Sequence, residues 1–245
     1  MSYLFIFKSL LLSLLMFHVS AQDGRCRTSF SCGYLGNISF PFTVTQHPHC
    51  GILAISGCRS NNTAAPKSIQ LGKPPSEQSL IATYVDRDTI TVTDEAQRKN
   101  LLVKNCQAFK NYTVPSTSPL ASFYIKYNIT MFKCNDSLSV NLPDYFNNYT
   151  NCRGYNLYYD LLNSVRPRGF KVPSSLAQCK QFQVAIRNRP TDDPFEFLSP
   201  EIVIQVQLSD DCNMCLRHQG GPCQLDIQGK FLCVEGMHRY FFVQL

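Results

Sequence analysis

The chain of 245 residues contains no tryptophan, and charged side chains make up only 16% of it. Beyond residue 21 it has no apolar run of the roughly 20 residues that a membrane helix needs. It also lacks Gly-x-Ser-x-Gly, His-Glu-x-x-His, a glycine-rich phosphate loop and the protein-kinase signatures. These absences argue against the common hydrolase, metalloprotease and kinase classes, so we expect a protein that is not an enzyme.

Positive charge is modest and dispersed. The formal net charge is +6, and no basic run exceeds two residues. This pattern does not indicate a nucleic-acid partner. It would favour an acidic extracellular polymer electrostatically, although ordinary surface charge explains it equally well.

The N-terminus predicts a secretory signal peptide over residues 1–21. An apolar run at 10–17 follows the single charge of Lys8, and Val19 and Ala21 supply the small residues that signal peptidase requires. An uncleaved signal anchor is the alternative, but the apolar segment is short for a membrane span. We therefore expect a secreted protein of the extracellular space or cell wall, with no membrane span in the mature chain.

The cysteine count predicts a disulfide framework, because an even number of cysteines behind a signal peptide is typical of secreted domains. The last four also have a spacing that could form half a zinc site. An oxidising compartment favours two disulfides there, so we expect no metal and no cofactor. The twelve cysteines are Cys26, Cys32, Cys50, Cys58, Cys106, Cys134, Cys152, Cys179, Cys212, Cys215, Cys223 and Cys233.

Six Asn-x-Ser/Thr sequons predict a glycoprotein. All of them lie before residue 149, which suggests two small extracellular modules, 22–151 and 152–245. The sequons are at Asn37, Asn61, Asn111, Asn128, Asn135 and Asn148.

The periodicity predicts a mainly β fold made of disulfide-rich antiparallel sheets with one or two short helices. Apolar and polar residues alternate over 124–132, 181–187 and 202–208, and 89–93 is rich in β-branched residues. Such alternation is typical of antiparallel sheets with one solvated face. Apolar residues at helical spacing predict one helix over 158–165, which Pro167 would end.

Several polar residues are candidates for chemistry. His47 and His49 could form a metal pair, but two loop histidines without a metal are the simpler interpretation. The doublets 192–193 and 210–211 could supply the paired carboxylates of a glycosidase. Adjacent acids in loops are usually just solvated.

Two groups of cations are candidates for binding an acidic polysaccharide, because lysine and arginine pair with its carboxylates. Either group could equally be ordinary solvated surface. The first group is Arg98, Lys99 and Lys104, and the second is Arg166, Arg168 and Lys171.

Two cysteine patterns resemble a known family. Cys26-x5-Cys32-Gly33, Ile38-Ser39-Phe40-Pro41-Phe42, Cys50-Gly51 and Cys58 resemble the galacturonan-binding module of plant wall-associated receptor kinases. Cys212-x2-Cys215, Gly220-Gly221-Pro222-Cys223 and Phe231-Leu232-Cys233 resemble its C-terminal module. Together they are similar to the ectodomain of leaf-rust-resistance-type receptor-like kinases.

The chain departs from this family in three respects. Gln224 follows Cys223, one expected cysteine after Cys233 is missing, and no membrane helix or kinase follows. The chain is therefore either a free-standing soluble ectodomain or the product of a truncated gene model or splice form.

The resemblance implies a non-catalytic protein that binds pectin, a galacturonan of the cell wall. The alternative is a soluble co-receptor or decoy that binds a peptide or a receptor-like kinase in defence or wall signalling. For modules of this kind we hypothesise nested pairs, Cys26–Cys58 and Cys32–Cys50.

Overall fold

The computed structural model describes residues 26–59, 64–71, 78–112, 118–161, 172–226 and 228–234. The expected signal peptide, the sequon at Asn61 and the cations Arg166, Arg168 and Lys171 lie outside the described residues. In the part of the chain that is described, no helix is long and apolar enough to cross a membrane.

The protein is mainly β, as the periodicity predicted, and three short α-helices lie between the strands of the described residues. The helices are α2 (Glu95–Leu102), α3 (Pro194–Phe197) and α4 (Asp210–Met214). The strands are β1 (Phe30–Ser31), β2 (Asn37–Ile38), β3 (Phe42–Val44), β4 (Leu53–Ile55), β5 (Lys67–Leu71), β6 (Gln78–Asp86), β7 (Thr89–Thr93), β8 (Ala121–Ile125), β9 (Asn128–Asn135), β10 (Phe146–Tyr149), β11 (Tyr155–Asp160), β12 (Lys180–Ala185), β13 (Glu201–Leu208), β14 (Cys223–Leu225) and β15 (Phe231–Cys233).

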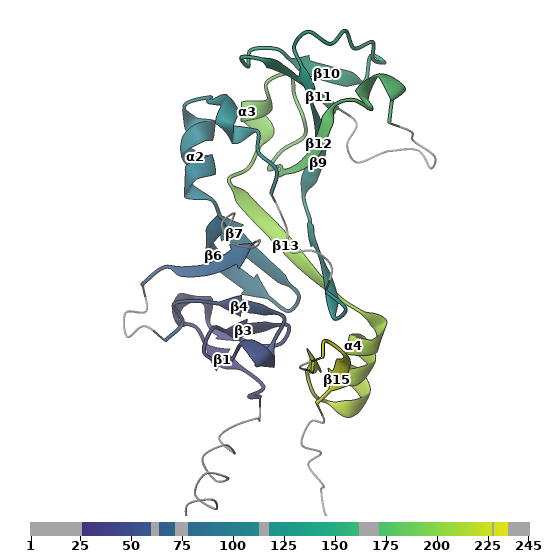
Figure 1. Ribbon diagram of the computed structural model, residues 1–245. Helices are drawn as coiled ribbons and strands as arrows, with labels where there is room; N and C mark the ends of the chain where they lie inside the picture. The colour runs from purple at the N-terminus through teal and green to yellow at the C-terminus, as the bar shows by residue number, and fades with distance from the viewer. Residues whose placement is uncertain are drawn as a thin grey trace, which may run out of the picture.

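Two larger sheets organise the molecule. One has the strand order β5-β6-β7-β13-β8 and the other β10-β11-β9-β12. The pairs β1-β2, β3-β4 and β14-β15 form small ribbons, and β3-β4 is the parallel one. Helices α2 and α3 lie near the four-stranded sheet, while β1 to β4 and the segment from α4 to β15 lie at the other end of the molecule (Figure 1).

Strand pairing runs across the division expected near residue 152. β13 pairs with β7 and β8, and β11 and β12 both pair with β9. Each larger sheet thus combines strands from before and after that residue. The two-module division stays a prediction, and the hydrogen-bonded sheets do not follow it.

Three predicted strands are confirmed. The segment 89–93 is β7, and 181–187 and 202–208 correspond to β12 and β13 within a residue or two at their ends. In β13 the alternation matches burial, since Ile202, Ile204 and Val206 are buried while their neighbours are partly or fully exposed. One apolar face of this strand therefore supports the core.

The predicted strand 124–132 is two strands instead of one. A bend at Lys126 and Tyr127 separates β8 from β9. β8 pairs with β13 in one sheet and β9 pairs with β11 and β12 in the other. The chain changes sheet at this bend, so Tyr127, expected on the buried face, is 56% exposed.

The predicted helix over 158–165 is contradicted where it should begin, because Tyr158 to Asp160 lie in strand β11, and its part at 162–165 lies outside the described residues. β11 has neighbours on both sides, and its two faces contribute to different cores, Leu157 and Tyr159 to one and Tyr158 to the other. A strand buried on both faces reads as a continuous apolar run rather than an alternating one. Tyr158, the first position of the predicted helical pattern, belongs to this run.

All twelve cysteines form disulfides, as the count predicted. The bonds are Cys26–Cys50, Cys32–Cys58, Cys106–Cys152, Cys134–Cys179, Cys212–Cys223 and Cys215–Cys233. The last two join the four cysteines whose spacing also suggested zinc. Their sulfurs are bonded in pairs within the segment from α4 to β15.

The nested pairing hypothesised for the first four cysteines is wrong. Cys26 bonds to Cys50 and Cys32 bonds to Cys58, so the two bridges cross. Nesting suits two segments that run in opposite directions, as in a hairpin. Here the first residues of the segments 26–32 and 50–58 are bonded to each other, and so are their last residues. The two segments therefore run in the same direction.

Gly51, next to Cys50, lies where the chain passes against β3. A Cβ atom at this position would lie 2.8 Å from Thr43 Cβ and 2.9 Å from the Pro41 carbonyl oxygen. Both atoms are fixed, since Thr43 is buried and the Pro41 carbonyl accepts hydrogen bonds from the backbone at Ile52 and Leu53. Only glycine, which has no Cβ atom, lets the two backbone segments pass this close to each other.

We expect Gly51→Ala to lower the free energy of unfolding by about 1–3 kcal/mol, because overpacking forces the backbone apart. Denaturant unfolding of the secreted protein measures this. Gly220→Asn is the control, since Gly220 adopts the left-handed conformation that Asn tolerates and has open space at Cβ. Equal losses in both variants would contradict the steric explanation.

Candidate functional site

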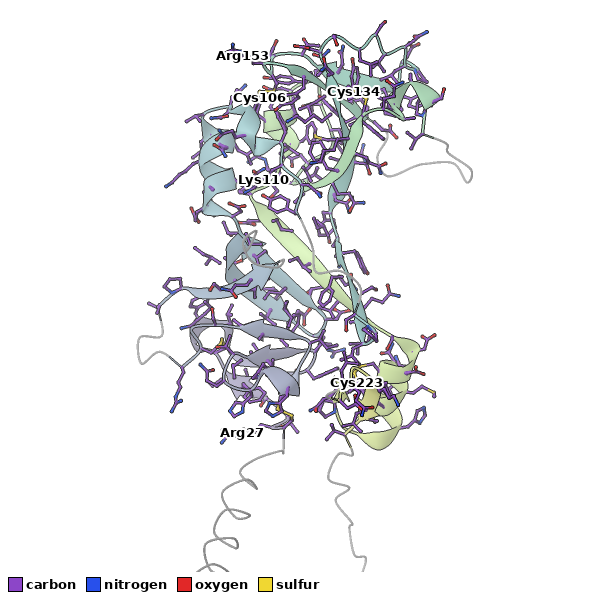
Figure 2. The ribbon with its side chains drawn as sticks, in the orientation of Figure 1. Arg27, Cys106, Lys110, Cys134, Arg153 and Cys223 are labelled. Atoms are coloured by element: carbon purple, nitrogen blue, oxygen red, sulfur yellow. A yellow bond between two sulfur atoms is a disulfide. The ribbon has the colours of Figure 1, made fainter. Side chains whose placement is uncertain are left out.

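A cavity of about 420 Å³ opens on the small ribbons that carry the first cysteine pattern. Its lining includes Arg27, Phe30, Val44, His47 and Arg59. We call this cavity the N-terminal groove. Figure 2 places Arg27 at one end of the molecule and Arg153 at the other, so the groove lies far from the four-stranded sheet.

The crossed disulfides position both arginines of the N-terminal groove. Arg27 follows Cys26, which is bonded to Cys50, and Arg59 follows Cys58, which is bonded to Cys32. Cys32 is fully buried in the core. The backbone at each arginine is therefore anchored one residue away, although both side chains are exposed.

An aromatic pair forms one wall of the groove. The rings of Phe30 and His47 stack with centroids 5.3 Å apart and planes 24° apart. The backbone holds this turn, because the His47 amide donates to the Val44 carbonyl at 2.8 Å and the Thr43 hydroxyl donates to the His47 carbonyl at 2.7 Å. Phe30 is only 9% exposed, so the half-buried His47 imidazole is the more accessible part of this wall.

The charge of the N-terminal groove is uniformly positive. Its lining contains no acidic residue, and the sequence from residue 24 to residue 76 contains no Asp or Glu. The salt bridges among the described residues involve neither Arg27 nor Arg59. Two cations that have no counterion among the described residues can pair with anionic groups of a ligand.

The nearby His and Cys side chains do not make a usable metal site. Cys26, His49 and Cys50 have ligand atoms within 4.8 Å of one another. However, the two sulfurs are bonded to each other, which leaves one imidazole as a ligand. His47 contributes to the aromatic wall described above.

The cations Arg98, Lys99 and Lys104 lie on and just after helix α2, away from the groove. Arg98 pairs with Glu95 at 3.1 Å, and Lys104 Nζ lies 2.6 Å from a carboxylate oxygen of Asp193. The hydrogen bond and the charge of Asp193 raise the pKa of Lys104. Two of these three cations are therefore already paired within the chain.

The two acidic doublets lie at the starts of short helices, and the side chains of the first doublet are hydrogen-bonded. Asp193 caps helix α3 by accepting from the Phe195 amide, and Asp192 accepts from the Asn147 side chain at 2.8 Å. Asp210 and Asp211 lie in the first turn of α4. The backbone carbonyls at 191 and 192 also accept from a buried tyrosine of β11, and burial raises the pKa of this Tyr159 hydroxyl.

Four of the five sequons within the described residues have exposed asparagines. Asn128 is half-buried, and its side-chain amide donates to the Ile125 carbonyl. The exposed positions offer room for a glycan. They are Asn37, Asn111, Asn135 and Asn148.

Sequence reasoning missed both arginines of the N-terminal groove. It searched for cations close together in the chain, whereas Arg27 and Arg59 are 32 positions apart. The usable signal was the long segment without acidic residues, in which Arg27 and Arg59 each directly follow a cysteine.

Comparison with protein-family models, with curated proteins and with solved structures returns no match.

Proposed function

We propose that the protein is a non-catalytic, secreted binding protein for an acidic polysaccharide of the plant cell wall, with pectic galacturonan as the ligand. The observation that carries this proposal is the N-terminal groove, whose lining combines two arginines that form no salt bridge among the described residues with the stacked rings of Phe30 and His47. Each galacturonate unit presents one carboxylate, which a guanidinium binds through two hydrogen bonds. The apolar face of a sugar ring can pack on the His47 imidazole, which Phe30 supports from behind.

The location of the groove agrees with the family resemblance. Its lining includes Cys58 and residues between Cys26 and Cys58, the stretch that resembles a galacturonan-binding module. The six disulfides and the absence of a membrane-spanning helix among the described residues are compatible with an extracellular protein. Secretion and the wall location belong to the proposal.

The test is binding of the secreted, glycosylated protein to de-esterified and methyl-esterified galacturonan at low and physiological salt. We expect tighter binding to the de-esterified polymer. This binding should weaken as salt rises, because the Debye length falls from about 30 Å at 0.01 M to about 8 Å at 0.15 M. Equal binding to both polymers at both salt concentrations would contradict carboxylate recognition.

Two matched variants locate the site. Arg27→Gln with Arg59→Gln should weaken binding about tenfold, since two exposed ion pairs are together worth about 1–2 kcal/mol. Arg98→Gln with Lys99→Gln removes the same charge from helix α2 and should change affinity less than about twofold. A larger loss of affinity in the variant of Arg98 and Lys99 than in the variant of Arg27 and Arg59 would place the binding site at the cations predicted from the sequence.

A further inference from the structure

A second cavity, of about 520 Å³, lies where the two larger sheets meet. We call it the junction groove. It is bordered by the bend at Lys126 and Tyr127, by the segment 186–190 after β12, and by the start of β13. It shares no lining residue with the N-terminal groove.

Backbone hydrogen bonds hold the three borders of the junction groove together. The Lys126 amide donates to the Val203 carbonyl at 2.8 Å, and the Ile186 amide donates to the Tyr127 carbonyl at 3.0 Å. The Arg187 amide donates to the Phe197 carbonyl at 2.8 Å. The groove is thus a preformed feature of the fold, and binding there needs little ordering of the backbone.

The junction groove carries charges of both signs. Arg187, Arg189 and Glu201 line it, all three are exposed, and none takes part in a salt bridge within the described residues. The Arg187 side chain is oriented by a hydrogen bond from Nε to the Glu196 carbonyl at 3.1 Å. A ligand that satisfies all three groups must itself carry acidic groups and a cation.

The rest of the lining is apolar or aromatic. Ile186, Pro190 and Val203 are half-buried, and the Tyr127 ring, 56% exposed, forms a wall. The Lys126 ammonium lies 5.6 Å from the centre of this ring. Exposed tyrosine beside arginine is typical of protein–protein contacts, where aromatic and guanidinium groups contribute much of the binding energy.

We propose that the junction groove binds a peptide segment that presents an apolar side chain between acidic residues and a lysine or amino terminus. The acidic residues would pair with Arg187 and Arg189, and the cation would pair with Glu201. A galacturonan chain fits less well, because its carboxylates would be repelled by Glu201 and it has no apolar side chain for the groove. The site is distinct from the polysaccharide site proposed above.

A phage-displayed library of random heptapeptides, selected on the whole secreted protein, tests this proposal. We expect enrichment of peptides that combine acidic and apolar residues. Their affinity should fall at least about tenfold in Arg187→Gln with Arg189→Gln, and stay unchanged in Arg27→Gln with Arg59→Gln. Unchanged thermal unfolding of both variants excludes misfolding as the cause.

Glu201→Gln is a second test variant, in which both arginines of the junction groove are kept. It should weaken only those selected peptides that carry a lysine or a free amino terminus beside the acidic residues. Failure to enrich any peptide, or equal binding to the arginine variant, would overturn the proposal. So would loss of galacturonan binding on substitution of Arg187 and Arg189, because the groove would then be a polysaccharide site.

Discussion

Replacing Cys32 and Cys58 with alanine is expected to lower the free energy of unfolding by about 3–4 kcal/mol. The bridge closes a loop of 26 residues, and the chain-entropy model assigns a stabilisation of this size to such a loop. Cys32 is also fully buried among the residues of the N-terminal core. Denaturant unfolding of the secreted variant measures the loss.

The pair Cys26→Ala with Cys50→Ala is the matched comparison, because it opens a loop of 24 residues. Chain entropy predicts nearly the same loss for both pairs. A change below about 1 kcal/mol in either variant would contradict a stabilising role for that bridge.

The same cysteines give a direct test of the crossed pairing. Cleavage after Arg27, between Cys32 and Cys50, and within the segment 51–57 places each of the four cysteines on its own fragment. Without reduction, the fragment with Cys26 should remain joined to the fragment with Cys50. Recovery of Cys26 joined to Cys58 would restore the nested scheme and contradict the fold of the N-terminal groove.

The second large effect is expected at Asp94, which is 6% exposed. One carboxylate oxygen accepts from the Gln97 amide at 2.8 Å and caps helix α2, while the other lies 2.6 Å from Lys110 Nζ. Asp94→Ala removes both contacts and leaves the ammonium of Lys110 without its partner. We expect a loss of about 2–3 kcal/mol in the free energy of unfolding, about 1 kcal/mol of it from the cap and the rest from the ion pair, since the Lys110 side chain is 29% exposed and can be partly solvated.

Two further variants separate the contributions of Asp94. Asp94→Asn keeps a helix cap but not the charge, so its loss should be about 1 kcal/mol smaller. Glu95→Gln breaks the neighbouring pair with Arg98, where both side chains are nearly half exposed, and should cost less than about 0.5 kcal/mol. A loss of the same size at Glu95 would show that helix α2 depends on surface charge and not on the buried pair.

The sequence predicted those features of the fold that depend on local pattern. Strands with one buried face, such as β7 and β13, keep the alternation of apolar and polar residues, and both were found at their predicted positions. Helix α2 was missed, because its sequence is polar and a single buried side chain, Gln97, faces the core. That helix depends on its Asp94 cap and on contacts from distant segments.

By itself, the sequence determined the class of the protein: a β-rich chain in which all twelve cysteines pair. Cysteine number is a property of the composition, and strand periodicity is a property of neighbouring residues. Neither depends on how distant segments pack, so both can be taken from the sequence. Only the tertiary structure decided which cysteines pair and which cations share a groove. Both depend on the relative direction of segments far apart in the chain, and packing around the buried Cys32 brings Arg27 and Arg59 to one cavity.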